Sequence, residues 1–162
     1  MNNVEMTNTL EELIKPETRI KPPATDEIEN FQVAQPRIVV MGCGGGGCNT
    51  INTLTNMGIQ GALTIAVNTD AKHLGMVKAN KKILIGRELT RGLGAGGYPE
   101  VGKKAAEESK QDLKRALKDC DLLFVTCGLG GGTGTGSIPV AAYLAKEMGS
   151  IVIGVVTLPF KI

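Results

Sequence analysis

Aromatic residues are scarce in this sequence of 162 residues: they make up 3% of the chain, and tryptophan is absent. The length is enough for one ordinary domain, but its core must be aliphatic. No apolar run approaches the roughly 20 residues that a membrane-spanning helix needs. The first residues, MNNVEMTNTLEEL, lack the basic start and apolar centre of a secretory signal. These absences predict a cytoplasmic protein with no direct membrane insertion.

Side chains that bind metals or transfer protons are also few. The four cysteines, at positions 43, 48, 120 and 127, form no CxxC pair, and small buried thiols are the usual case in a reducing compartment. The single histidine, His73, is expected to be a surface residue on a helix. The sequence therefore identifies no metal ligands and predicts no catalytic residue within the chain.

The first 36 residues differ in composition from the rest. They carry seven acidic and three basic residues together with four prolines, which predicts a flexible acidic tail with one short helix near residues 9–14. The remainder is basic, and many of its lysines fall on a predicted helix over residues 103–118. Acidic residues interrupt that basic run and no aromatic residue accompanies it, so we expect no nucleic-acid partner.

Continuous apolar runs begin at Arg37 and recur along the chain. They cover residues 37–42, 63–68, 82–86, 121–128 and 150–158, and such runs are typical of strands buried on both faces. Helical stretches over residues 49–57, 103–118 and 137–148 lie between several of them. Alternation of this kind predicts an α/β fold: an open, mostly parallel Rossmann-like sheet with helices on both faces. Ligands of such sheets bind beyond the carboxyl ends of the strands.

The first glycine-rich segment, MGCGGGGCN over residues 41–49, follows a predicted strand and begins a helix. Gly42, Gly44 and Gly47 satisfy the G-x-G-x-x-G pattern of dinucleotide-binding proteins, and Asp70 follows at about the expected distance of ~20 residues. An NAD(P)-dependent oxidoreductase that uses these residues is therefore one alternative. The pattern alone is weak, because any turn that approaches a phosphate needs glycine.

The second glycine-rich segment, CGLGGGTGTGS over residues 127–137, again follows a strand and begins a helix. Its amides can face an anion, and the hydroxyls of Thr133 and Thr135 add donors. A side chain at Gly132 or Gly134 is expected to obstruct the phosphate, with a smaller effect on folding. The sequence lacks G-x-x-x-x-G-K-[ST], so backbone amides must replace the lysine of a P-loop.

Several motifs resemble one known family. GGGTGTG over residues 130–136 resembles the signature loop of the tubulin and FtsZ superfamily. GCGGGGCN is similar to the first phosphate loop of FtsZ, NTDA (68–71) to the second, GLGAGGYPEVG (92–102) to the third, and TLPF (157–160) to the strand end before the fifth. The order and spacing agree from about Arg37 onward. The resemblance implies that residues 37–162 are the N-terminal part of the GTP-binding domain of a polymer-forming protein of prokaryotic cell division.

The resemblance also implies ligands and partners. These are GTP or GDP with Mg²⁺, other copies of the chain in a protofilament, and other cell-division proteins at the division site. The implied nucleotide-binding residues are Gly44, Gly45, Gly46, Gly47 and Asn49; Asn68, Thr69 and Asp70; Ala95, Gly96 and Gly97; and Gly130, Gly131, Gly132, Thr133, Gly134 and Thr135.

The family's hydrolytic carboxylates come from the next subunit, and its sugar and guanine contacts lie beyond the position that matches Ile162. We therefore expect an incomplete pocket without the C-terminal domain, and no GTP turnover by this chain alone. Two positions depart from the family pattern: Tyr98 replaces a common asparagine, and Cys48 replaces a small residue. A nucleotide-binding or filament-interacting module without catalysis is the remaining alternative.

Overall fold

The computed structural model describes residues 35–159, so almost all of the predicted tail lies outside the described residues. The strands and helices within this part of the chain are, in order, β1 (Ile38–Cys43), α3 (Gly44–Asn56), β2 (Ala62–Asn68), α4 (Ala71–Met76), β3 (Lys81–Leu84), α5 (Arg87–Thr90), α6 (Pro99–Glu108), α7 (Lys110–Ala116), β4 (Leu122–Gly128), α8 (Gly132–Glu147) and β5 (Ile151–Thr157).

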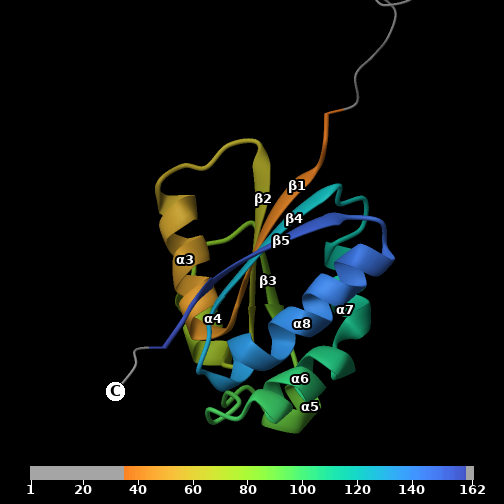
Figure 1. Ribbon diagram of the computed structural model, residues 1–162. Coiled ribbons are helices and arrows are strands. Elements are labelled where there is room, and N and C mark those ends of the chain that lie inside the picture. The colour runs from red at the N-terminus through yellow and green to blue at the C-terminus, as the bar shows by residue number, and fades with distance from the viewer. Residues whose placement is uncertain (1–34, 160–162) are drawn as a thin grey trace, which may run out of the picture. The chain divides into compact units, whose positions relative to one another are not determined.

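The strands form one parallel sheet in the order β3-β2-β1-β4-β5. Helices α3 and α4 cover one face of this sheet, and α6, α7 and α8 cover the other (Figure 1). The predicted fold class is confirmed. All five predicted strands are present because each apolar run is long enough for one strand and is followed by a glycine, a polar residue or a turn. The expectation that such runs are buried on both faces is wrong for β5, whose residues are mostly exposed.

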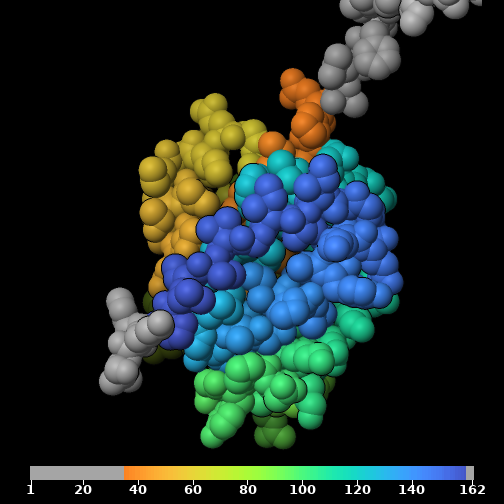
Figure 2. All heavy atoms as spheres, in the orientation of Figure 1, coloured from red at the N-terminus to blue at the C-terminus, as the bar shows by residue number. Residues whose placement is uncertain are grey.

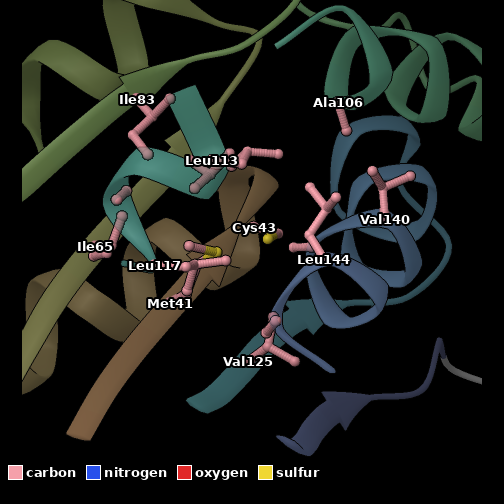
Figure 3. Close-up of a cluster of buried hydrophobic side chains, with 14 of the residues drawn as sticks. Met41, Cys43, Ile65, Ile83, Ala106, Leu113, Leu117, Val125, Val140 and Leu144 are labelled. Atoms are coloured by element: carbon pink, nitrogen blue, oxygen red, sulfur yellow. The ribbon is translucent and has the colours of Figure 1, made fainter. Parts of the chain in front are cut away.

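The main core lies between the sheet and helices α6, α7 and α8 (Figure 3). It is aliphatic, as the composition requires: Met41, Leu113 and Leu123 are completely buried, and Leu144 of α8 packs with them. A smaller cluster around Ile51 fills the space under α3 and α4.

Three helices differ from their predicted bounds. The predicted helix over residues 103–118 is two helices, α6 and α7, joined at Ser109, whose hydroxyl accepts the N–H of Gly86 at 3.0 Å. Helices α3 and α8 begin at Gly44 and Gly132, about five residues earlier than predicted. Glycine is a poor helix former, so the sequence pattern placed these residues in loops. The short helix α5 was not predicted, and α4 was expected only as a helix that carries His73.

Strand β5 lies across the front of the molecule in Figure 2. Most of its apolar residues are exposed to solvent. Ile151 is 68% exposed, and Leu158, which follows the strand, is 77% exposed. An apolar groove of about 300 Å³ lies beside this strand, between Leu54 of α3, Phe124 of β4 and Val155 of β5. Within the described residues, no helix is long and apolar enough to cross a membrane.

All four thiols are free and buried, and burial changes their acidity. It raises the pKa of Cys43 and the pKa of Cys48 from 9.0 to about 12, because a thiolate in the core would lose its hydration. The folded state then keeps two protons that the unfolded state releases above pH 9. Stability contributed by these thiols is complete below that pH and is lost as the pH rises towards 12.

We therefore predict that the free energy of unfolding falls between pH 9 and 12, by about 1 kcal/mol per pH unit for each of these two thiols. Urea unfolding over a pH series measures the slope. The Cys48→Ala variant removes one titrating group, so its slope should be smaller by the contribution of one thiol. The difference between the two slopes excludes the contribution of other groups that titrate at alkaline pH. An unchanged slope in this variant would contradict the prediction.

Candidate functional site

The order of the strands places the point where the chain connections diverge at the carboxyl ends of β1 and β4. From β1 the chain continues into α3 on one face of the sheet, and from β4 it continues into α8 on the other. Ligands of open α/β sheets bind where neighbouring strands diverge in this way. The two glycine-rich segments form the connections at this point, as predicted.

The two glycine-rich segments pack directly against each other. A Cβ atom added to Gly44 would lie 2.6 Å from the backbone nitrogen of Gly134, and one added to Gly47 would lie 2.5 Å from the carbonyl oxygen of Thr126. Gly44 also has a φ of 71°, which disfavours other residues. Gly44 is therefore needed for the close approach of one loop to the other, and Gly47 is needed for the packing of α3 against β4.

Gly132 and Gly134 of the signature loop are also needed for packing against protein backbone. The expectation that a side chain at either position would mainly obstruct a phosphate is therefore wrong. A Cβ atom on Gly132 would lie 2.7 Å from the nitrogen of Tyr98, and one on Gly134 would lie 2.9 Å from the carbonyl oxygen of Cys43. The space that a side chain would occupy is filled by protein backbone and is not reserved for a ligand. A valine at either position will first disturb the fold.

Two other glycines of the predicted site face open space. No heavy atom lies within 4 Å of a Cβ added to Gly45 or to Gly131, and both residues are exposed. Gly45 lies in the first turn of α3, and Gly131 is the N-cap of α8. Neither helix has a side-chain cap, so N–H groups of both first turns lack a side-chain acceptor. Two positive helix ends thus meet at one edge of the sheet.

The second loop is held in place by its own side chains. The Oδ1 atom of Asn68 accepts the N–H groups of Thr69 at 2.9 Å and Asp70 at 3.3 Å. Asp70 caps α4 by accepting the N–H of His73 at 2.9 Å. The hydroxyls of Thr69 and Thr133 lie 2.6 Å apart in a buried hydrogen bond, which joins the second loop to the signature loop.

The third loop is tied to the second by backbone hydrogen bonds. The N–H of Gly94 donates to the carbonyl of Thr69 at 3.2 Å. Ala95 is buried, whereas Gly96 and Gly97 are exposed and have φ values of 59° and 82°. The side chain of Tyr98 is 68% exposed and follows these glycines at the N-cap of α6. Glycine is favoured at the two exposed positions because their φ values are positive.

Not every predicted donor of the signature loop is available to a ligand. The N–H of Gly130 donates to the hydroxyl oxygen of Thr135 at 3.2 Å. The Thr135 hydroxyl keeps its own proton to donate elsewhere. Because Thr69 and Thr133 share one hydrogen bond, one of their two hydroxyl protons is likewise still available.

Sequence reasoning missed the connection between the first and second loops. The ring of His73 lies between two predicted site residues: Nε2 is 3.1 Å from Oδ1 of Asn49, and Nδ1 is 3.2 Å from Nδ2 of Asn68. His73 is half-buried and is therefore not the plain surface residue that the sequence suggested. No local pattern could reveal the bond to Asn49, which lies 24 residues away.

The predicted site contains almost no charged side chains. Asp70 is its only acid, and none of the predicted residues is basic. Among residues 35–159, no group of three or more His, Cys, Asp or Glu side chains could hold a metal ion. Any anion bound here must therefore be held mainly by backbone N–H groups and hydroxyls, and any cation would take most of its ligands from that anion and from water.

The family model described as the GTPase domain of the Tubulin/FtsZ family matches residues 37–162. "Cell division protein FtsZ 2" of Methanocaldococcus jannaschii is 66% identical over 131 residues, which are 81% of this chain and 34% of that protein.

Two solved structures are also similar. An empty FtsZ dimer from M. jannaschii matches with a TM-score of 0.78 and 54% identity, over 87% of this chain and 41% of that one. The protofilament of CetZ2 from Haloferax volcanii with bound GTPγS matches with a TM-score of 0.66 and 29% identity, over 74% of this chain and 39% of that one. The chain thus spans well under half the length of these relatives.

Proposed function

The chain belongs to the Tubulin/FtsZ family, and from this premise we propose that its glycine loops bind GTP or GDP through the phosphates, as part of a polymer-forming cell-division GTPase. The observation that carries the proposal is the meeting of two uncapped helix N-termini, those of α3 and α8, at the carboxyl ends of β1 and β4. Helix N-termini of this kind attract phosphate through their N–H groups and their positive ends.

Each loop then has a part in holding the nucleotide. The first loop and the signature loop offer their exposed amides at Gly45, Gly46 and Gly131 to the phosphates. The third loop offers Gly96 and Gly97 to the end of the triphosphate. Asp70 is the one carboxylate available near a Mg²⁺ ion, which binds few protein ligands and keeps phosphate oxygens and water for the rest. The residues present therefore fit a magnesium–nucleotide complex.

Hydrolysis is proposed to occur between subunits. Phosphoryl transfer to water depends on a positioned water molecule and on stabilised phosphate charge. The loops supply the second requirement with backbone donors, and a neighbouring copy supplies the first with carboxylates. The dimer and protofilament relatives support assembly of this kind. The corresponding location is the cytoplasm at the division site, together with other division proteins.

The oxidoreductase alternative has no support from the comparisons. The G-x-G-x-x-G glycines Gly42, Gly44 and Gly47 are explained by close packing within the chain.

Calorimetric titration with GTP, GDP, GMP and NAD tests the proposal. We expect GMP to bind at least about tenfold more weakly than GDP, because each hydrogen bond to a charged phosphate contributes about 1.5–3 kcal/mol. We expect NAD to bind more weakly than GTP. Equal affinities for GMP and GTP would contradict phosphate binding by the loops, and preference for NAD would favour the oxidoreductase.

A further inference from the structure

His73 connects two side chains that belong to different loops of the proposed site. Asn49 lies on α3, Asn68 ends β2, and His73 lies on α4 between them. Both ring nitrogens are within hydrogen-bond distance of an amide, at 3.1 Å for Asn49 and 3.2 Å for Asn68. The direction of each hydrogen bond depends on which ring nitrogen carries the proton.

Asn68 of the second loop determines which ring nitrogen of His73 carries the proton. The Oδ1 atom of Asn68 accepts two backbone N–H groups, from Thr69 and Asp70, so the amide cannot be turned round without losing both. Its Nδ2 therefore faces His73 as a donor, and Nδ1 of the imidazole must be an acceptor without a proton. In a neutral ring the proton is then on Nε2, which donates to Oδ1 of Asn49.

The same logic sets the orientation of Asn49. Because its oxygen accepts from the imidazole, its Nδ2 is the atom left for another partner. No acceptor in the described part of the chain makes a hydrogen bond to this Nδ2, and Asn49 is exposed at the edge where the phosphates are proposed to bind. A turned amide would present its carbonyl oxygen to the phosphate and repel it.

We propose that His73 is a positioning residue of the nucleotide site: its Nε2–H tautomer, set by Asn68, turns the amide of Asn49 so that a donor faces the phosphate. The inference rests on the proposed function. His73 itself does not contact the nucleotide and transfers no proton. It transmits the rigid geometry of the second loop to the first loop through two hydrogen bonds.

The tautomer can be measured without any ligand. The chain contains one histidine, so the imidazole of ¹⁵N-labelled protein gives a single set of two-bond ¹H–¹⁵N correlations. We expect the pattern of the Nε2–H tautomer in the folded full chain. A folded wild-type chain with the proton on Nδ1 would overturn the inference.

Two conservative variants separate the two hydrogen bonds. In His73→Gln the amide nitrogen takes the place of Nε2 and can still donate to Asn49, whereas in His73→Asn the side-chain oxygen takes the place of Nδ1 and only the bond to Asn68 can remain. We expect His73→Gln to bind GTP within about threefold of the unsubstituted chain. We expect His73→Asn to bind GTP about tenfold more weakly, because the amide of Asn49 is no longer oriented and its hydrogen bond to the charged phosphate is lost.

If His73 had only a structural role, the loss of GTP affinity in each variant would follow the loss of its stability. Thermal unfolding of both variants measures that stability in parallel. In an Asn49→Ala background the difference between histidine and asparagine at position 73 should disappear, since the two effects share one contact. GTP binding by the unsubstituted chain that His73→Asn leaves unchanged would overturn this inference alone. No GTP binding by the unsubstituted chain would instead refute the proposed function and, with it, the role given to Asn49.

Discussion

The Gly136→Ala variant is expected to lose about 3 kcal/mol of stability, the upper part of the range for overpacking a close contact. Gly136 lies in α8 where this helix meets α6. The added Cβ atom would overlap the carbonyl oxygen of Pro99 and lie 2.5 Å from the nitrogen of Lys103. Both are backbone atoms, so no side-chain rotation can relieve the overlap and the two helices must move apart. Urea unfolding monitored by circular dichroism measures the loss.

The Gly75→Ala variant is the matched control, because it makes the same chemical change in another helix. A Cβ on Gly75 meets no heavy atom within 4 Å, and this glycine has no left-handed backbone. Its stability should be unchanged or higher by up to about 1 kcal/mol, since alanine is the better helix former. A Gly136→Ala variant as stable as the original chain would contradict the close backbone contact between α6 and α8.

Strand positions could be predicted from the sequence because each strand is a short apolar run with a polar or glycine boundary. The starts of α3 and α8 could not be predicted, because glycine is a poor helix former. Both helices begin where the two glycine-rich segments pack together, with Gly44 against Gly134. The break between α6 and α7 is equally non-local. It depends on the bond from Gly86 to Ser109, which lies 23 residues away in the sequence.

The site was predictable to a similar extent. Parallel strands bring their carboxyl ends to one edge, so the convergence of the glycine-rich segments followed from the strand pattern. What each glycine does could not be read in the same way. Gly131 and Gly134 are two signature-loop positions of the same residue type, yet one faces open space and the other faces the carbonyl of Cys43. Only the three-dimensional contacts distinguish a glycine needed for packing from one free to meet a ligand.

The Gly131→Asp variant is expected to fold normally and to bind GTP on the order of 100-fold more weakly or worse. Gly131 is the N-cap of α8, with φ −91° and ψ 168°, a conformation that any residue adopts, and the space around it is open. A carboxylate there can accept N–H groups of the first helical turn, which should raise stability by a few tenths of a kcal/mol. It would do so by occupying the position proposed for phosphate.

The Gly131→Asn variant separates charge from size, because its side chain has nearly the same shape and caps a helix equally well. We expect it to bind GTP only a few-fold more weakly than the original chain. The additional loss of GTP affinity in Gly131→Asp, compared with Gly131→Asn, is electrostatic. It should become smaller as salt is added, since salt screens exposed charges. Calorimetry of both variants at low and high salt, with thermal unfolding in parallel, gives the comparison. If the aspartate and asparagine variants bound GTP with equal affinity at low salt, the phosphates would not lie at the N-terminus of α8, and the first loop alone would have to hold them.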